Sequence, residues 1–137
     1  MSLEQDPIDE FEAARAELQA ISAQADANAQ GAAALADDAR TLQASVRSPR
    51  GEVTVTARVG GAISAVQFAD AALSLRPAEL SRLVETTIAQ AQFQAAQRFA
   101  DRAAEAFGTD SEIAAQLRAD ALAAFPEPGP DTTGIRY

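Results

Sequence analysis

The sequence predicts a small α+β protein: a long N-terminal helix, a small antiparallel sheet of two to three strands, a long second helix and a short third helix. Two observations lead to this fold class. Most of the chain is rich in alanine and has helical periodicity, whereas only residues 51–68 (GEVTVTARVGGAISAVQF) alternate as strands do. A lone hairpin is marginally stable in water, so we expect the sheet to dimerise with that of a second copy.

The length of 137 residues favours one domain, which we expect over residues 1–125, followed by a disordered acidic tail over 126–137. Hydrophobic residues make up 47% of the chain but aromatic residues only 5%, so the core must be built from Ala, Leu, Val and Ile. Small proteins with thin cores often gain stability by oligomerising, which also favours a homodimer.

The first helix is expected over about residues 7–44, with Pro7 suited to its first position. A heptad pattern runs along it. One position of the repeat is occupied by Phe11, Leu18, Ala25, Ala32, Ala39 and Val46, and the other by Ala14, Ile21, Asn28, Leu35 and Leu42. We call this stripe the heptad seam. Asn28 either fixes the register of a helix pair or is an ordinary exposed residue.

Strands are expected over about residues 45–68. Residues 48–51 form a turn with Pro at its second position and Gly at its fourth. Residues 45–47 before it form either a short first strand, which we favour, or the frayed end of the helix. Gly60-Gly61 is expected to be a two-residue hairpin loop.

Pairing Val59 with Ala62 across that loop places Val55 opposite Val66 and Val53 opposite Phe68. One face of the hairpin would then carry Val53, Val55, Ala57, Val59, Val66 and Phe68, and the other Thr54, Thr56, Arg58, Ile63, Ala65 and Gln67. The separation of apolar and polar faces supports this register.

The second helix is expected over about residues 77–107, with Gly108 as its C-cap. Its apolar stripe is Leu80, Val84, Ile88, Ala91, Ala95, Phe99 and Ala103. Thr109 and Glu112 have the spacing of a capping box, which predicts a third helix over about residues 110–125 that ends at Pro126.

The absence of Cys and His excludes disulfides, thiolate nucleophiles, Ser-His-Asp triads and the usual zinc sites. Asp37-Asp38 fits a solvated helix face better than an acid/base or metal site, and Gly60-Gly61 lacks a phosphate-loop context. We therefore expect no catalytic residue, metal, cofactor or small-molecule substrate. No apolar run is long enough to span a membrane and the acidic N-terminus lacks a signal-peptide core, so we expect a cytoplasmic protein.

The net charge of −9 is unevenly spread. Residues 1–44 hold nine acids and two arginines, residues 45–102 five acids and seven arginines, and residues 103–137 six acids and two arginines. Only the middle of the chain offers a surface for an anionic partner. Arg47, Arg50 and Arg58 cluster around the turn and hairpin, where they contact either phosphates or another protein, or simply aid solubility.

From about Leu42 to Phe107 the chain resembles the YbaB/EbfC family of bacterial nucleoid-associated proteins, in particular its actinobacterial members. The resemblance is carried by GEVTVTARVGGAISAVQFADAAL followed by LRPAELSRLVETTIAQAQFQAAQRF. The positions that match the family pattern are Val53, Val55, Gly60, Val66, Phe68, Asp70, Glu79 and Leu80.

The resemblance implies an α-β-β-β-α protomer and a homodimer whose hairpins share a sheet. The implied dimer interface is Val53, Val55, Ile63, Ala65, Val66 and Phe68. It also implies binding of double-stranded DNA in the nucleoid with low sequence specificity, and Arg47, Arg50 and Arg58 as the phosphate contacts. The acidic first helix departs from a simple DNA binder. The alternative is a protein-interaction scaffold or chaperone-like adaptor, such as one associated with secretion, that has lost DNA binding.

Overall fold

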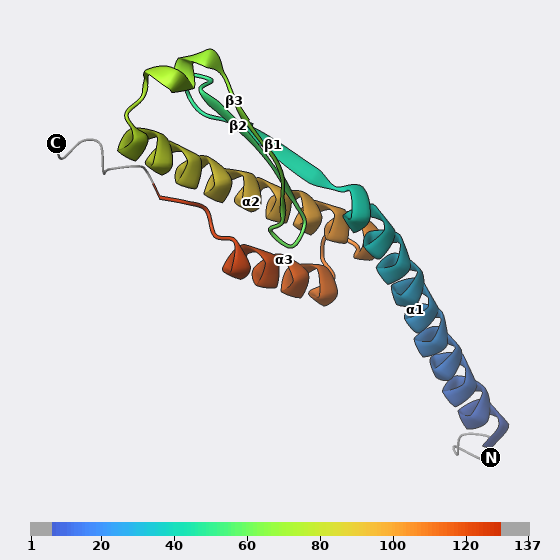
Figure 1. Cartoon of the computed structure of the whole chain (residues 1–137). Helices are drawn as coiled ribbons and strands as arrows, with labels where there is room; N and C mark the ends of the chain where they lie inside the picture. Colours follow the sequence, from blue (N-terminus) through green and yellow to red (C-terminus); the bar gives the residue numbers. More distant parts are fainter. Residues whose placement is uncertain (1–6, 130–137) are drawn as a thin grey trace.

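The computed structural model describes residues 7–129 (Figure 1). Its elements follow the predicted order of one long helix, three strands and two further helices, so the α+β fold class is confirmed. A short 3₁₀ helix, η1, joins the sheet to the second helix. In chain order the elements are α1 (Pro7–Thr41), β1 (Gln43–Arg47), β2 (Val53–Arg58), β3 (Ile63–Phe68), η1 (Asp70–Ser74), α2 (Pro77–Phe107) and α3 (Glu112–Ala124).

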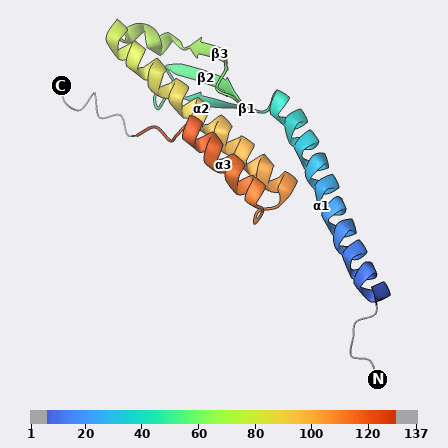
Figure 2. The same cartoon turned by 90° about the horizontal axis from the view of Figure 1, so that it is seen from below.

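The core lies between α2 and one face of an antiparallel sheet with strand order β1-β2-β3 (Figure 2). Val53 and Val55 of β2 are fully buried against α2, which meets them with Ala91 and Ala95. Small alanine side chains let the helix approach the sheet closely, and the larger Leu80, Val84 and Ile88 pack around this contact. The helix packs on β1 and β2, so β3 is left at the edge of the covered area.

The hairpin register is confirmed along most of β3, where Val53 pairs with Phe68 and Val55 with Val66. It is wrong near the loop. The expected Arg58–Ile63 pair is replaced by Ala57–Ile63, because a β-bulge follows Thr56. The loop is one residue longer than expected: the Arg58 N–H donates to the Ala62 carbonyl at 2.8 Å, which closes the turn around Gly60 and its neighbours.

The first helix extends away from the rest of the molecule (Figure 1). Only its C-terminal part packs on α2, and Gly31 and Leu35 are its buried residues. A Cβ added at Gly31 would lie 3.0 Å from the Phe107 ring, so glycine allows the two helices to cross closely. The helix ends at Thr41, three residues before the predicted end near 44, because β1 already begins at Gln43.

The short helix α3 packs on α2 beyond the sheet (Figure 2). Ala114 is buried in this contact, and Arg118 bonds Asp101 of α2 at 2.8 Å. The N-cap is Ser111, whose Oγ accepts a hydrogen bond from the Ala114 N–H, so the expected capping role of Thr109 is wrong. Gly108 caps α2 as predicted.

Within residues 7–129, no helix is long and apolar enough to cross a membrane. The predicted tail begins at Pro126, and residues 126–129 have no regular secondary structure. Its remainder, residues 130–137, lies outside the described residues.

Candidate nucleic-acid interface

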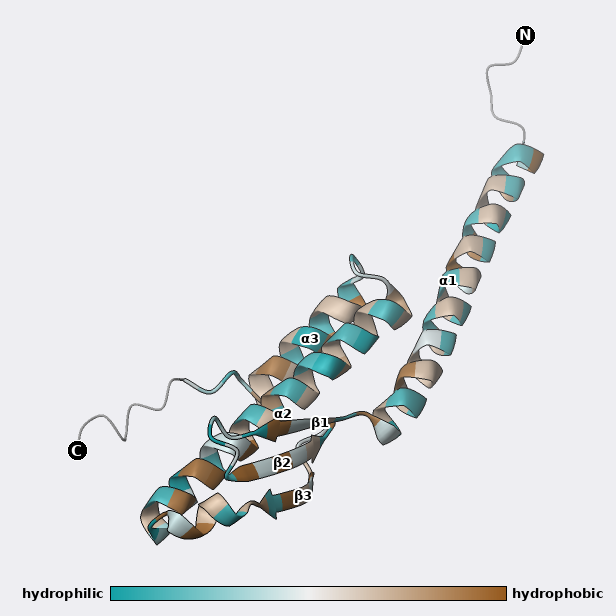
Figure 3. Ribbon diagram, turned by 90° about the horizontal axis from the view of Figure 1, so that it is seen from above, coloured by the Kyte–Doolittle hydropathy of each residue, from teal (hydrophilic) through white to brown (hydrophobic). Residues whose placement is uncertain are grey.

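The face of the sheet opposite α2 carries only polar and small side chains. Among the described elements, α2 is the helix that packs on the strands, and it covers the other face (Figures 2 and 3). Alternation along the strands and the cross-strand pairs place eight residues on the free face: Gln43, Ser45, Arg47, Thr54, Thr56, Arg58, Ala65 and Gln67. We call these eight residues the outer sheet face. None of them is acidic, so the outer sheet face is a local exception in an acidic chain.

Hydroxyl groups occupy the centre of the outer sheet face. Ser45 and Thr56 are a cross-strand pair whose hydroxyl oxygens lie 2.7 Å apart. Arg58 pairs with Gln43 at one end, and Arg47 pairs with Thr54 at the other. Serine, threonine, glutamine and arginine side chains are common donors to phosphate and sugar oxygens, so this arrangement suits a polyanion.

The turn after β1 holds Arg47 in place. Ser48 is buried, its Oγ accepts from the Val53 N–H at 3.0 Å, and it donates to Glu52 at 3.0 Å. Gly51 adopts φ 77°, and a Cβ added there would lie 2.6 Å from Nη2 of Arg47. The Arg47 guanidinium therefore lies against Gly51; a larger residue there would displace it and would be strained at this positive φ.

The three predicted arginines do not form one cluster. Arg47 and Arg50 lie at the turn before β2, and Arg58 lies at the opposite end of that strand. Arg58 is four residues from Thr54, the partner of Arg47, a separation of about 13 Å along the strand. Within residues 7–129 none of the three has an ion pair, although Arg50 lines a hollow of about 250 Å³ that also includes Glu52 and Glu79.

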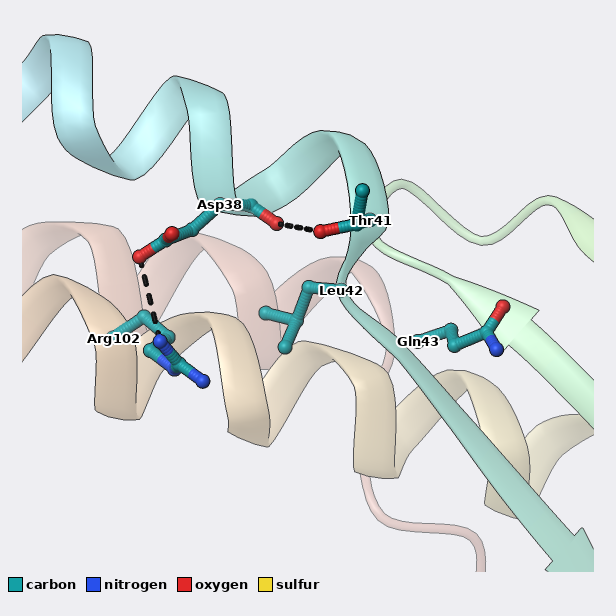
Figure 4. A pocket seen from close by; sticks show the side chains of 5 residues that line it. All are labelled: Asp38, Thr41, Leu42, Gln43 and Arg102. Atoms are coloured by element: carbon teal, nitrogen blue, oxygen red, sulfur yellow. Dashed lines mark hydrogen bonds and ion pairs between the residues drawn. The ribbon is translucent and has the colours of Figure 1, made fainter.

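Arginines of α2 have a different role. Arg102 bonds Asp38 of α1 at 3.5 Å across a hollow of about 230 Å³, and the Thr41 hydroxyl donates to the Asp38 carbonyl (Figure 4). Arg98 donates to the Gln43 carbonyl at the start of β1. These contacts fix the corner between α1 and β1, so both guanidinium groups are engaged within the molecule.

The six residues expected at a dimer interface separate into three groups. Val53 and Val55 have no exposed surface, so they belong to the core of the single chain and offer nothing to a partner. Ile63, Val66 and Phe68 of β3 are exposed by 36%, 38% and 56%. Ala65 pairs with Thr56 and so lies on the outer sheet face.

Strand alternation predicts Thr54, Thr56, Arg58 and Gln67 on the polar face of the hairpin, and the structure agrees. The same prediction for Ile63 is wrong, because the bulge places it opposite Ala57. The favoured first strand over residues 45–47 is confirmed, but it begins earlier, at Gln43, and the side of the sheet that it faces was not predicted. The alternation of Gln43, Ser45 and Arg47 with the inward-facing Ala44 and Val46 was the available signal. It is only five residues long and directly follows a strong helical pattern.

The fold and this face together define a small α-β-β-β-α protein with an arginine- and hydroxyl-bearing sheet. The chain belongs to the YbaB/EbfC DNA-binding family, whose family model matches residues 14–109. The family comprises nucleoid-associated DNA-binding proteins and is not known to be enzymatic. Comparisons with curated proteins and with solved structures found no match. The matched range ends before α3, so this helix lies outside the match.

Proposed function

We propose that the protein is a homodimeric, nucleoid-associated protein that binds double-stranded DNA with little sequence preference. The observation that supports this most is the outer sheet face, which joins Arg47 and Arg58 to hydroxyl and amide donors without a carboxylate. Phosphate contacts dominate affinity for DNA of any sequence, and an acid-free surface is where an acidic protein can make them. Arg50, on the adjoining turn, is the third proposed phosphate contact.

The exposed apolar side chains of β3 support the homodimer. Val66 and Phe68 pair with buried residues of β2 and so lie on the same side of the sheet as α2, yet α2 does not cover them. Ile63 joins them on that side, because the bulge places it opposite Ala57. A second copy placed against these three residues would complete the apolar layer that one protomer leaves open.

Fluorescence anisotropy of a labelled DNA duplex tests the proposal. Three arginines from each protomer would make about six phosphate contacts, so affinity should fall about a thousandfold between 50 and 200 mM salt. Two unlabelled duplexes of unrelated sequence should compete equally, since phosphate contacts carry no sequence information.

The double variant Arg47→Gln, Arg58→Gln should weaken binding and flatten the salt dependence, because it removes four of the six proposed contacts. Arg118→Gln is the matched control, since Arg118 lies on α3 in an ion pair with Asp101. Circular dichroism would show that each variant is folded. A flat salt response in the unmodified protein, or a double variant that binds as the control does, would contradict the proposal.

One observation favours the second candidate, a protein-interaction adaptor. Residues 7–41 of α1 hold seven acids and two arginines, a net charge of −5, and this repels phosphates. An adaptor would show no DNA binding even at 50 mM salt. Affinity capture with the purified protein as bait would then identify its partner.

A further inference from the structure

Most of α1 has no neighbour to cover its apolar side. Phe11, Leu18 and Ile21 are exposed by 66%, 66% and 59%. All three belong to the heptad seam, and the same seam is buried further along at Leu35, where it packs near α2. The seam is thus a packing surface that the single chain uses at one end only. Figure 3 shows this first part of α1 standing apart from the sheet and from α3.

We propose that the first part of α1 forms a parallel two-stranded coiled coil with the same segment of a second copy. The paired layers would be Phe11, Ala14, Leu18, Ile21, Ala25 and Asn28, each facing its own counterpart. A repeat of apolar residues every 3.5 positions is the pattern that two helices bury against each other. The pairing must end near Asn28, because the Phe107 ring lies against α1 at Gly31.

The charges beside the seam agree with the parallel direction. Phe11, Leu18 and Ala25 form the first series of the seam. In a parallel coiled coil, the residue just before each of them lies beside the residue of the partner helix that is five positions later in the sequence. This brings Glu10 of one copy beside the partner subunit's Arg15 on both sides of the pair. The next such pairs, Glu17 with Ser22 and Gln24 with Ala29, contain no like charges.

Asn28 favours a second copy as the occupant over an unrelated helix. Gln24 donates to the Asn28 Oδ1 at 3.1 Å, which orients the amide and leaves its Nδ2 donors for another acceptor. In register, that acceptor is the same amide of the second copy. This register is favoured because any other would bury the two amides against apolar side chains without a hydrogen-bond partner.

Salt should strengthen this contact. Residues 7–30 hold five acids and one arginine, so two of these segments repel each other at low ionic strength. Screening reduces that repulsion without weakening the apolar layers. The proposed DNA contact has the opposite dependence, so the two interactions can be separated in one protein.

Disulfide cross-linking of the full chain tests the proposal, since the sequence contains no Cys. Ala14→Cys places a thiol in the seam, and Ala16→Cys places one on the opposite side of the same helix as the matched control. Under mild oxidation we expect the Ala14→Cys protein to form a covalent dimer at least tenfold faster than the Ala16→Cys protein, and faster still at higher salt. Adding Leu18→Glu to both proteins should abolish the difference between their cross-linking rates.

Other outcomes would overturn the inference. Equal cross-linking at the two positions would exclude a specific seam contact. Linkage of Ala14→Cys to Ala25→Cys in a mixture, without linkage of Ala14→Cys to itself, would establish the antiparallel direction instead. The Leu18→Glu protein should retain the DNA affinity of the unmodified protein, so a failure of either proposal is seen independently of the other.

Discussion

Ser48 shows how one small side chain organises the candidate interface. It is buried, and its hydroxyl joins the Val53 N–H to the Glu52 carboxylate within the turn that carries Arg47 and Arg50. Glu52 is itself only 7% exposed and depends on this donor. The sequence predicted the turn from Pro49 and Gly51, and the Gly51 N–H to Ser48 carbonyl bond of 2.8 Å confirms it.

We expect Ser48→Ala to lower the free energy of unfolding by about 1–3 kcal/mol, because two buried polar groups lose their partner. Ser22→Ala, at an exposed position of α1, should change stability by less than about 0.5 kcal/mol. Urea unfolding followed by circular dichroism measures both. Equal stabilities of the two variants would show that the Ser48 hydroxyl is dispensable.

The residue types and their alternation predicted some of the side chains on the outer sheet face, but they did not predict how far apart the arginines lie. Arg58 was placed correctly on the polar face by strand alternation, and Thr54 and Thr56 with it. The separation of Arg58 from Arg47 depends on the strand pairing, because Arg47 ends β1 opposite Thr54 at the start of β2, whereas Arg58 ends β2. Val53 and Val55 were expected at a dimer interface, but α2 covers them, and local alternation cannot distinguish a helix of the same chain from a partner.

Helical periodicity predicted all three helices, whereas the ends of elements depended on finer detail. Pro77 and Gly108 bound α2 as expected, because proline and glycine act through backbone geometry. The end of α1 was misplaced by three residues, because Leu42 and Ala44 suit a helix as well as a strand. The bulge after Thr56 has no sequence signal, since an extra residue changes the pairing but leaves the alternation of apolar residues nearly intact.

The cap of α3 allows a direct test between the sequence-based expectation and the structure. Ser111→Ala should destabilise α3 by about 1 kcal/mol, because its Oγ accepts from the Ala114 N–H. Thr109→Ala should have little effect. Amide hydrogen exchange within residues 112–124 is the appropriate measurement, since α3 can fray while the sheet stays folded. Faster exchange in the Thr109→Ala protein, without faster exchange in the Ser111→Ala protein, would show that Thr109 caps α3.

At the scale of the whole molecule, the charges are divided between elements. The acids concentrate on α1, while the outer sheet face carries arginines without acids. Under the proposed function, a DNA duplex would be attracted to the sheet and repelled by α1. This division would reconcile a net charge of −9 with membership of a DNA-binding family.

In the Leu18→Glu protein, which lacks the proposed α1 contact, dimerisation through β3 predicts that adding Phe68→Glu lowers the molecular mass measured by sedimentation equilibrium, because a charge would be buried in an apolar contact. Phe68 is 56% exposed in the single chain, so the variant should still fold. Ile113→Glu is the matched control, since Ile113 is an exposed apolar residue on α3. An unchanged mass for Phe68→Glu would place the dimer contact elsewhere.

The long helix has a consequence for how the molecule moves through a medium. Its 35 residues span about 52 Å, whereas a compact chain of 137 residues has a radius of gyration of about 14 Å. A rod attached to a small body experiences more friction than a sphere of the same mass. A single chain will therefore elute early from a sizing column, as a globular protein of greater mass would, and elution volume alone would suggest a dimer where only one chain is present.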